Sequence, residues 1–111
     1  MDNSAEAIVV MMTAASQDEA SRIAEMLIGA RLAACVQILP EIESVYRWQG
    51  EVKREHEILV LAKTVASRFE ELESKVRAMH SYETPEIIAV PVTDSSAPYL
   101  AWLLAELREN S

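Results

Sequence analysis

One short stretch concentrates the side chains of this sequence that are able to do chemistry. Residues 80–94 read HSYETPEIIAVPVTD, so an imidazole, a phenol and two carboxylates precede an apolar run. Neutral imidazole binds copper and zinc, and two carboxylates whose pKa values differ can act as acid and base. Either these side chains line a site, or they hold the entrance of a strand together. The stretch alone leaves both interpretations open.

Metal binding would centre on His80, which follows Met79 at the end of a predicted helix. A cationic imidazole at that place also favours the helix C-terminus, so capping is the simpler interpretation. As a metal ligand, His80 would be joined by the thioethers of Met79 and Met12, soft ligands suited to Cu(I). A methionine in a strand more often fills a gap in the core. No HxxxH, HExxH or EF-hand spacing is present, so a metal site must be assembled from separate elements or subunits.

Catalysis is weakly supported. Glu83 and Glu86 flank Pro85, but three residues of extended chain place the two acids on opposite faces, and no nucleophile lies near them. The lone Cys35 indicates a buried structural thiol, with a metal ligand or reactive thiolate as the alternative. Glu57 is the last acid before an apolar run, so it can lie at a subunit boundary beside a base such as Lys63 of another turn or chain.

Composition restricts the classes of function. The 111 residues suffice for one domain, spanning 1–111, and the net charge of −8 repels phosphate backbones and anionic membranes. We therefore expect no nucleic-acid and no membrane partner. The single cysteine cannot form an internal disulfide, and residues 1–12 lack a basic region and a long apolar run, so we expect a cytoplasmic protein. No glycine-rich loop exists to hold a phosphate group.

The first half of the chain predicts a strand, a helix and a second strand. Residues 7–14 are apolar and β-branched, as in a buried strand. Ser16 and Glu19 have the spacing of a capping box, in which each side chain bonds the other's backbone amide at the start of a helix. The strand pattern returns at residues 32–48, where Pro40 predicts a bulge, a kink or an edge position.

The second half predicts a hairpin, a helix, a strand and a last helix. Gln49-Gly50 is suited to a hairpin tip that leads into a strand over residues 51–64. Residues 67–70 have a second capping-box spacing, a fourth strand covers about 85–93, and Pro98 suits the first turn of the last helix. The order β-α-β-β-α-β-α predicts an α+β, ferredoxin-like fold, with an antiparallel sheet backed by helices and a C-terminal helix.

The hairpin is too long for a lone domain. A strand over residues 51–64 reaches roughly 45 Å, whereas a compact domain of this size is only about 34 Å across. The hairpin should project and leave an open edge, with Tyr46 and Trp48 near its tip in water. Pairing with further copies of the chain would satisfy that edge, so we expect a homo-oligomer.

Several stretches together resemble the divalent-cation tolerance protein family CutA. They are LAACVQILPEIESVYRWQGE (32–51), EILVLAKT (57–64), HSYETPEIIAVPV (80–92) and YLAWL (99–103). The resemblance implies a homotrimer similar in architecture to the PII signalling proteins, a cytoplasmic role in copper tolerance, and a polar cleft between subunits. The cleft residues that it implies are Cys35, Tyr46, Trp48, Glu57, Lys63, His80, Tyr82, Glu86 and Trp102.

The sequence departs from the resemblance where copper ligands are implied. Some members have a cysteine in the first strand and two histidines before the Y-x-x-P-E segment. Here Met12 and Met79 stand at two of those positions and only His80 is kept, so Cu(II) affinity should fall.

Three functions follow from these observations. The first is a trimeric, non-enzymatic metal-tolerance protein that binds copper weakly. The second is a PII-like sensor that binds a small molecule between subunits and signals to an unidentified protein partner. The third is an enzyme that uses His80 and Glu86 as acid and base.

Overall fold

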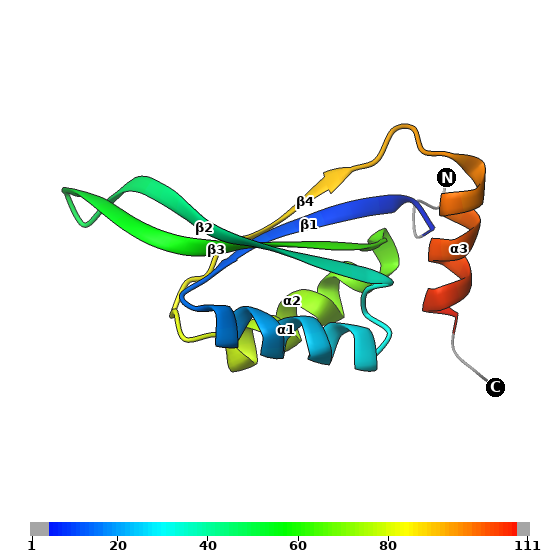
Figure 1. Cartoon of the computed structure of the whole chain (residues 1–111), viewed down its shortest axis with the longest axis horizontal. Coiled ribbons are helices and arrows are strands. Elements are labelled where there is room, and N and C mark those ends of the chain that lie inside the picture. Colours follow the sequence, from blue (N-terminus) through cyan, green and yellow to red (C-terminus); the bar gives the residue numbers. More distant parts are fainter. Residues whose placement is uncertain (1–4, 109–111) are drawn as a thin grey trace.

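Four strands form one antiparallel sheet, two helices cover one of its faces, and a third helix stands at one end (Figure 1). The computed structural model describes residues 5–108. In chain order the elements are β1 (Ala7–Ala14), α1 (Gln17–Gly29), β2 (Cys35–Trp48), β3 (Glu51–Val65), the 3-10 turn η1 (Ala66–Arg68), α2 (Phe69–Met79), β4 (Ile87–Pro91) and α3 (Ala97–Leu107). The strand order is β2-β3-β1-β4, which confirms the ferredoxin-like α+β fold. A single domain over 1–111 stays a prediction, since it extends past the described residues.

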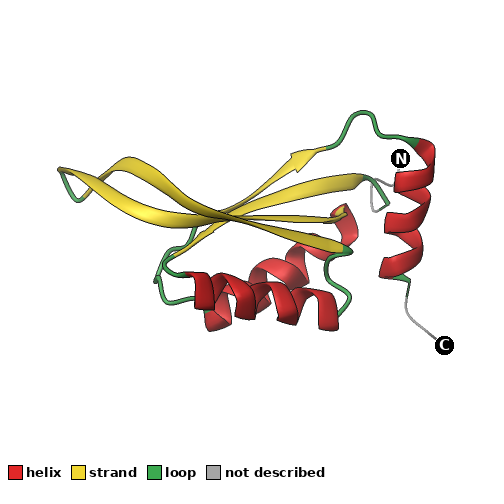
Figure 2. Ribbon diagram, in the orientation of Figure 1, coloured by secondary structure: helices red, strands yellow, loops and turns green. Residues whose placement is uncertain are grey.

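The main core lies between the sheet and the two helices α1 and α2 (Figure 2). Alternation along β1 sends every second side chain toward the helices, so Val10 and Met12 are fully buried. Ile23 and Leu27 of α1, at helical spacing, are buried against them, as are Leu72 and Val76 of α2. Met12 is therefore a core residue.

The two predicted capping boxes have different outcomes. At α1, Ser16 Oγ accepts from the backbone N–H of Glu19 at 3.1 Å, as predicted. The return bond is different, because the Glu19 carboxylate accepts from the N–H of Ala15 rather than that of Ser16. The box at residues 67–70 is wrong. Ser67 lies inside the η1 turn and Arg68, which precedes α2, has helical backbone angles, whereas a capping residue needs extended backbone.

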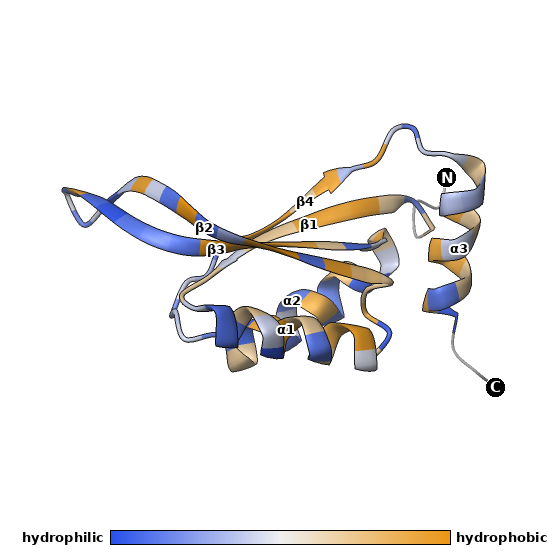
Figure 3. Ribbon diagram, in the orientation of Figure 1, coloured by the Kyte–Doolittle hydropathy of each residue, from blue (hydrophilic) through white to orange (hydrophobic). Residues whose placement is uncertain are grey.

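The β2–β3 hairpin gives the molecule its long axis of 47 Å. Its tip, Gln49 and Gly50, has φ values of 50° and 82°, the left-handed pair that a tight two-residue hairpin turn requires. A shift of register lies between Leu39 and Ile42 around Pro40, and β2 is an edge strand, so both the bulge and the edge position are confirmed. The part of the hairpin near its tip is mostly hydrophilic (Figure 3).

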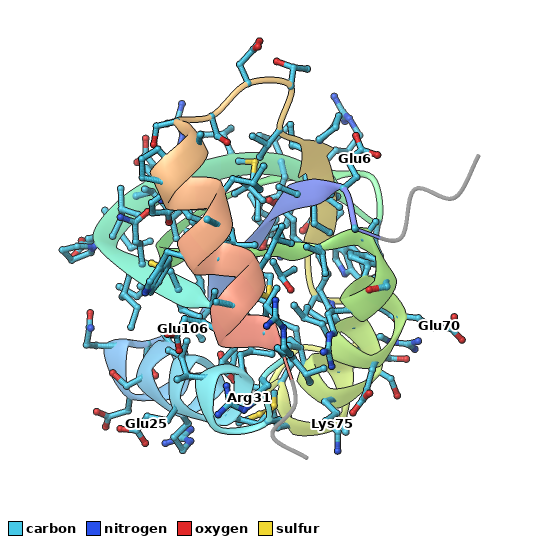
Figure 4. All side chains as sticks on the ribbon, turned by 90° about the vertical axis from the view of Figure 1, so that its right-hand side faces the viewer. Glu6, Glu25, Arg31, Glu70, Lys75 and Glu106 are labelled. Carbon is cyan, nitrogen blue, oxygen red and sulfur yellow. The ribbon has the colours of Figure 1, made fainter. Side chains whose placement is uncertain are left out.

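The last part of the chain differs in length from its prediction. β4 covers only Ile87–Pro91, because it pairs with β1 alone, over Ile8 to Met12. α3 begins as predicted, with Pro98 in its first turn and Ser96 accepting from the N–H of Tyr99. Its C-terminal carbonyls accept from two arginines. Arg31 Nη1 donates to the carbonyl of Glu106, and Arg68 Nη2 donates to that of Leu107, both at 2.7 Å. Figure 4 shows Arg31 beside the end of α3.

Candidate binding groove

An open groove of about 770 Å³ lies under the outer half of the hairpin. It is lined mainly by the parts of β2 and β3 nearer the hairpin tip and by residues 82–86, which connect α2 to β4. Of the nine predicted cleft residues, the structure brings five together here: Tyr46, Trp48, Glu57, Tyr82 and Glu86. The other lining residues are Thr13, Ser44, Val45, Lys53, Glu55, Glu83, Thr84 and Pro85.

A buried phenol–carboxylate pair forms the floor of the groove. The hydroxyl of Tyr82 donates to Oε2 of Glu57 at 3.0 Å, and Glu57 is only 8% exposed. Burial and this bond raise the pKa of Tyr82 well above its ordinary value. The phenol therefore stays protonated at neutral pH and holds the Glu57 carboxylate in place. Glu57 thus pairs with Tyr82 in this chain, and not with Lys63.

The wall on the hairpin side is aromatic and acidic. Tyr46 donates to Oε1 of Glu55 at 2.9 Å, and this hydrogen bond is the main reason that the pKa of Tyr46 is raised. Trp48 is half-exposed. Lys53, the one base among the described lining residues, lies 3.6 Å from the carboxylate of Glu51.

Glu19, which sequence reasoning treated only as a capping residue, organises the layer behind the groove. Its carboxylate accepts from the N–H of Ala15 at 2.9 Å and from the N–H of Ser81 at 2.7 Å. Burial by itself would raise the pKa of Glu19, but these hydrogen bonds outweigh it and lower that pKa. The bond to Ser81 ties the α2–β4 connection to the start of α1. The only signal in the sequence was the Ser16-to-Glu19 spacing.

His80 completes this layer with both ring nitrogens. Nε2 lies 2.8 Å from the carbonyl of Thr13, and Nδ1 accepts from the N–H of Tyr82 at 3.0 Å. This pattern assigns the neutral tautomer with the proton on Nε2. The ring is fully buried and bonds β1 instead of the last carbonyls of α2, so the predicted capping role for the imidazole is wrong. The polar side chains after residue 80 hold the strand entrance together and also form one wall of a groove.

The predicted copper ligands do not fit a copper centre within one chain. Met12 has no exposed surface, and both nitrogens of His80 are already hydrogen-bonded. Met79 is about a third exposed at the end of α2. Over residues 5–108, no group of three or more His, Cys, Asp or Glu side chains could hold a metal ion. The structure therefore does not support a metal site at Met12, Met79 and His80 of a single chain.

The three remaining cleft residues, Cys35, Lys63 and Trp102, lie away from the hairpin tip, because Cys35 and Lys63 form the end of the β2–β3 ladder opposite the tip and Trp102 belongs to α3. Cys35 is the cross-strand partner of Lys63, so their side chains share one face of the sheet. The Lys63 ammonium lies 5.7 Å from the centre of the Tyr99 ring, which is 5.5 Å from that of Trp102. A single chain thus divides the predicted cleft into two separate parts.

Comparisons with known proteins give one consistent result. A family model described as "CutA1 divalent ion tolerance protein" matches residues 8–106. The chain is 46% identical to a divalent-cation tolerance protein CutA of Thermus thermophilus, covering 93% of this chain and 96% of that protein. It is 44% identical to a chloroplastic CutA of Arabidopsis thaliana over 86% of this chain and 53% of that protein. The structure of CutA1 from Oryza sativa superposes with a TM-score of 0.91 at 39% identity, covering 98% of this chain and 100% of that one.

Within the described residues, no helix is long and apolar enough to cross a membrane.

Proposed function

The chain belongs to the CutA1 divalent ion tolerance family, and from this we propose that it acts in divalent-cation tolerance as a non-enzymatic homotrimer. The observation that carries the proposal is the division of the cleft residues between two regions of one chain. A cleft that contains both parts requires a second copy. Three features of the chain favour assembly with further copies.

The first feature is an uncovered apolar face on the sheet. α1 and α2 cover only the opposite face (Figure 2). Cross-strand register places seven apolar side chains on the uncovered face: Val9, Met11, Leu39, Leu59, Leu61, Ile88 and Val90. Ile88 is 50% exposed and Val90 44%. Such a face favours burial against further copies of the chain.

The second feature is the pair of open edges of the sheet. The strand order makes β2 one edge and β4 the other. If the β2 edge of one copy meets the β4 edge of the next, the contact is heterologous, and a rotation that closes produces a ring. Such a ring would also bury the exposed aliphatic side chains near the hairpin tip, Val45 and Val52. The number three comes from the resemblance to the family.

The third feature is the predicted cleft. In a head-to-tail ring, the groove of one copy can meet the α3 region of its neighbour. Lys63, Cys35 and Trp102 of the neighbour would then complete the set that Tyr46, Tyr82 and Glu57 begin. The acidic groove and the lysine have opposite charges, which favours this pairing.

Copper is the cation that the resemblance implies, but the tolerance role proposed here does not require copper held by one chain. If a single chain does not hold copper through His80, calorimetric titration with Cu(I) and Cu(II) gives equal results for the wild type and His80→Ala. Copper binding that is lost in His80→Ala would contradict this part of the proposal. The location proposed is the cytoplasm, on the grounds of the lone cysteine.

A PII-like sensor role is the second candidate, and the groove favours it. A hollow of about 770 Å³ with aromatic walls has the size of a small-molecule site. A metabolite that binds only the folded chain would raise its melting temperature, which a thermal-shift screen would detect. An unidentified protein partner remains part of this candidate.

The assembly is tested by sedimentation velocity at micromolar concentration. Ile88→Lys places a charge on the uncovered sheet face, and Ile28→Lys is a matched control on α1, since the two side chains are 50% and 45% exposed. We expect the wild type and Ile28→Lys to sediment as trimers and Ile88→Lys as a smaller species. A folded wild-type monomer of 12.4 kDa would refute the proposal.

A further inference from the structure

The turn that ends α1 has an arginine in its left-handed position. The N–H of Leu32 donates to the carbonyl of Leu27 at 2.9 Å. The N–H of Arg31 donates to the carbonyl of Ile28 at 3.1 Å. These two bonds define a Schellman motif, in which the residue at the place of Arg31 is usually glycine. Arg31 has a φ of 56°, which is a strained conformation for a residue with a Cβ atom, so its side chain should have a role of its own.

The side chain of Arg31 reaches a helix 75 residues further along the chain. Its Nη1 atom donates to the carbonyl of Glu106 at 2.7 Å, in the last turn of α3. That turn contains no basic residue, and the acid Glu106 is unfavourable beside the negative end of the helix dipole. The guanidinium of Arg31 therefore satisfies a terminal carbonyl and supplies the positive charge that α3 itself lacks.

The rest of α3 is anchored by a small cluster. Leu103 and Leu107 are its buried side chains, and they pack on Val65 in a cluster separate from the main core. Arg68 at the end of η1 donates to the carbonyl of Leu107. Because Arg31 follows α1 and Arg68 precedes α2, the two guanidinium groups tie the end of α3 to both helices of the main core (Figure 4).

The position of α3 matters because the helix carries an exposed aromatic pair. Tyr99 and Trp102 are 39% and 43% exposed, and their ring centres are 5.5 Å apart. The ammonium of Lys63 lies 5.7 Å from the centre of the Tyr99 ring, which adds a positive charge to this surface. Aromatic and basic side chains complement the acidic groove under the hairpin of a second copy.

We propose that Arg31 is a positioning residue for assembly, which holds α3 so that Tyr99 and Trp102 meet the groove of a second copy. This role rests on the homotrimer proposed above. Arg31 is not among the cleft residues that the resemblance to the family implies. A glycine at this position would relieve the strain of the turn, but it would leave the carbonyl of Glu106 without this donor.

Two substitutions separate the backbone of Arg31 from its side chain. Arg31→Ala removes the guanidinium and keeps the strained backbone, whereas Arg31→Gly removes both the guanidinium and the strain. Arg22→Ala is the control, since it removes an exposed positive charge from the same helix. Amide hydrogen exchange in α3 should become about two- to fivefold faster in both Arg31 variants. The N–H of Leu32 should exchange more slowly in Arg31→Gly than in Arg31→Ala.

Subunit exchange measures the consequence for assembly. Two pools of the protein, labelled at the N-terminus with a donor or an acceptor dye, are mixed and followed by energy transfer. We expect exchange about two- to fivefold faster in both Arg31 variants, because a smaller fraction of the chains then holds α3 in the competent position. Arg22→Ala should exchange at the wild-type rate. Circular dichroism confirms that each variant is folded.

Three results would overturn the role of Arg31 and leave the homotrimer intact. The first is wild-type subunit exchange in both Arg31 variants. The second is faster exchange in Arg31→Ala that Arg31→Gly restores, because the effect then follows the stability of the turn and not the contact with α3. The third is an equal effect of Arg22→Ala, which would reflect charge alone. A wild type that sediments as a 12.4 kDa monomer would instead refute the homotrimer, so the two failures are distinguishable.

Discussion

Glu19 provides the sharpest test of how the site is built, because its carboxylate joins two distant parts of the chain. Glu19→Gln keeps the volume of the side chain and removes its charge. One amide oxygen then replaces two carboxylate oxygens, so the N–H of Ala15 and the N–H of Ser81 can no longer both be satisfied. A group that is only 4% exposed offers little room for water to replace the lost bond.

The size of the effect follows from these contacts. Hydrogen bonds to a charged group contribute about 1.5–3 kcal/mol each, and an orphaned donor costs about 1–3 kcal/mol. Because Ala15 and Ser81 themselves lie near the surface, we take the lower part of these ranges, about 1.5–2 kcal/mol. With a urea m-value of about 1–3 kcal/mol per molar, the unfolding midpoint should fall by about 0.5–2 M.

The assay is urea unfolding followed by far-ultraviolet circular dichroism, at one fixed protein concentration because assembly shifts apparent stability. Glu25→Gln is the matched control, since it changes an exposed acid of the same helix that points into solvent (Figure 4). We expect this control to lie within about 0.5 kcal/mol of the wild type.

The pH dependence has a definite sign. The pKa of Glu19 is lowered in the folded state, so the stability that its charge contributes is present above the ordinary pKa of 4.5. It is lost as the pH falls through the folded-state value. The gap between wild type and Glu19→Gln should therefore be full at pH 7 and narrow below pH 4.5. The reasoning is refuted if Glu19→Gln matches Glu25→Gln at pH 7, or if the gap stays constant on acidification.

Three further predictions concern the hairpin, the groove floor and α3. Gly50→Ala should lower stability by about 1 kcal/mol, because the φ of Gly50 is +82°, whereas Gly29→Ala in α1 should raise stability by about 0.5 kcal/mol. Thermal melts measure both changes, and equal shifts would contradict this backbone explanation. Tyr82→Phe should cost about 1.5 kcal/mol in urea unfolding by removing a donor to buried Glu57, and the wild type should lose this advantage as the pH rises above 10.0; an unaffected midpoint would be the contrary result. Arg31→Ala should lower the free energy of local opening of α3 by about 0.5–1 kcal/mol, measured as faster amide hydrogen exchange, with little change in α2. A uniform change across both helices would argue against a local role of Arg31.

Local sequence patterns predicted much of the fold. The alternation in β1 and the left-handed preference at the hairpin tip determine their structures through backbone sterics and side-chain direction, which act over a few residues. Pro40, which cannot donate to a ladder, predicted the bulge in the same way. The second capping box failed because spacing alone does not reveal that Ser67 has a turn conformation.

The candidate site was only partly visible in the sequence. The residue types after residue 80 indicated a polar site, but they did not show which of its groups are hydrogen-bonded to one another. Residue type and position made His80 a candidate for helix capping or for metal binding, whereas its contacts with Thr13 and Tyr82 use both ring nitrogens. The role of Glu19 was missed because its partner Ser81 lies 62 residues away.

The sequence by itself determined the order of the elements, the length of the hairpin and the membership in a family, since each depends on residue types at short or fixed spacing. Only the tertiary structure decided that the cleft residues divide between the groove and the α3 region, and that Met12 belongs to the core. Contacts between distant segments depend on how the strands align in the sheet. Their spacing along the chain does not contain that alignment, so the packing of the folded chain had to supply it.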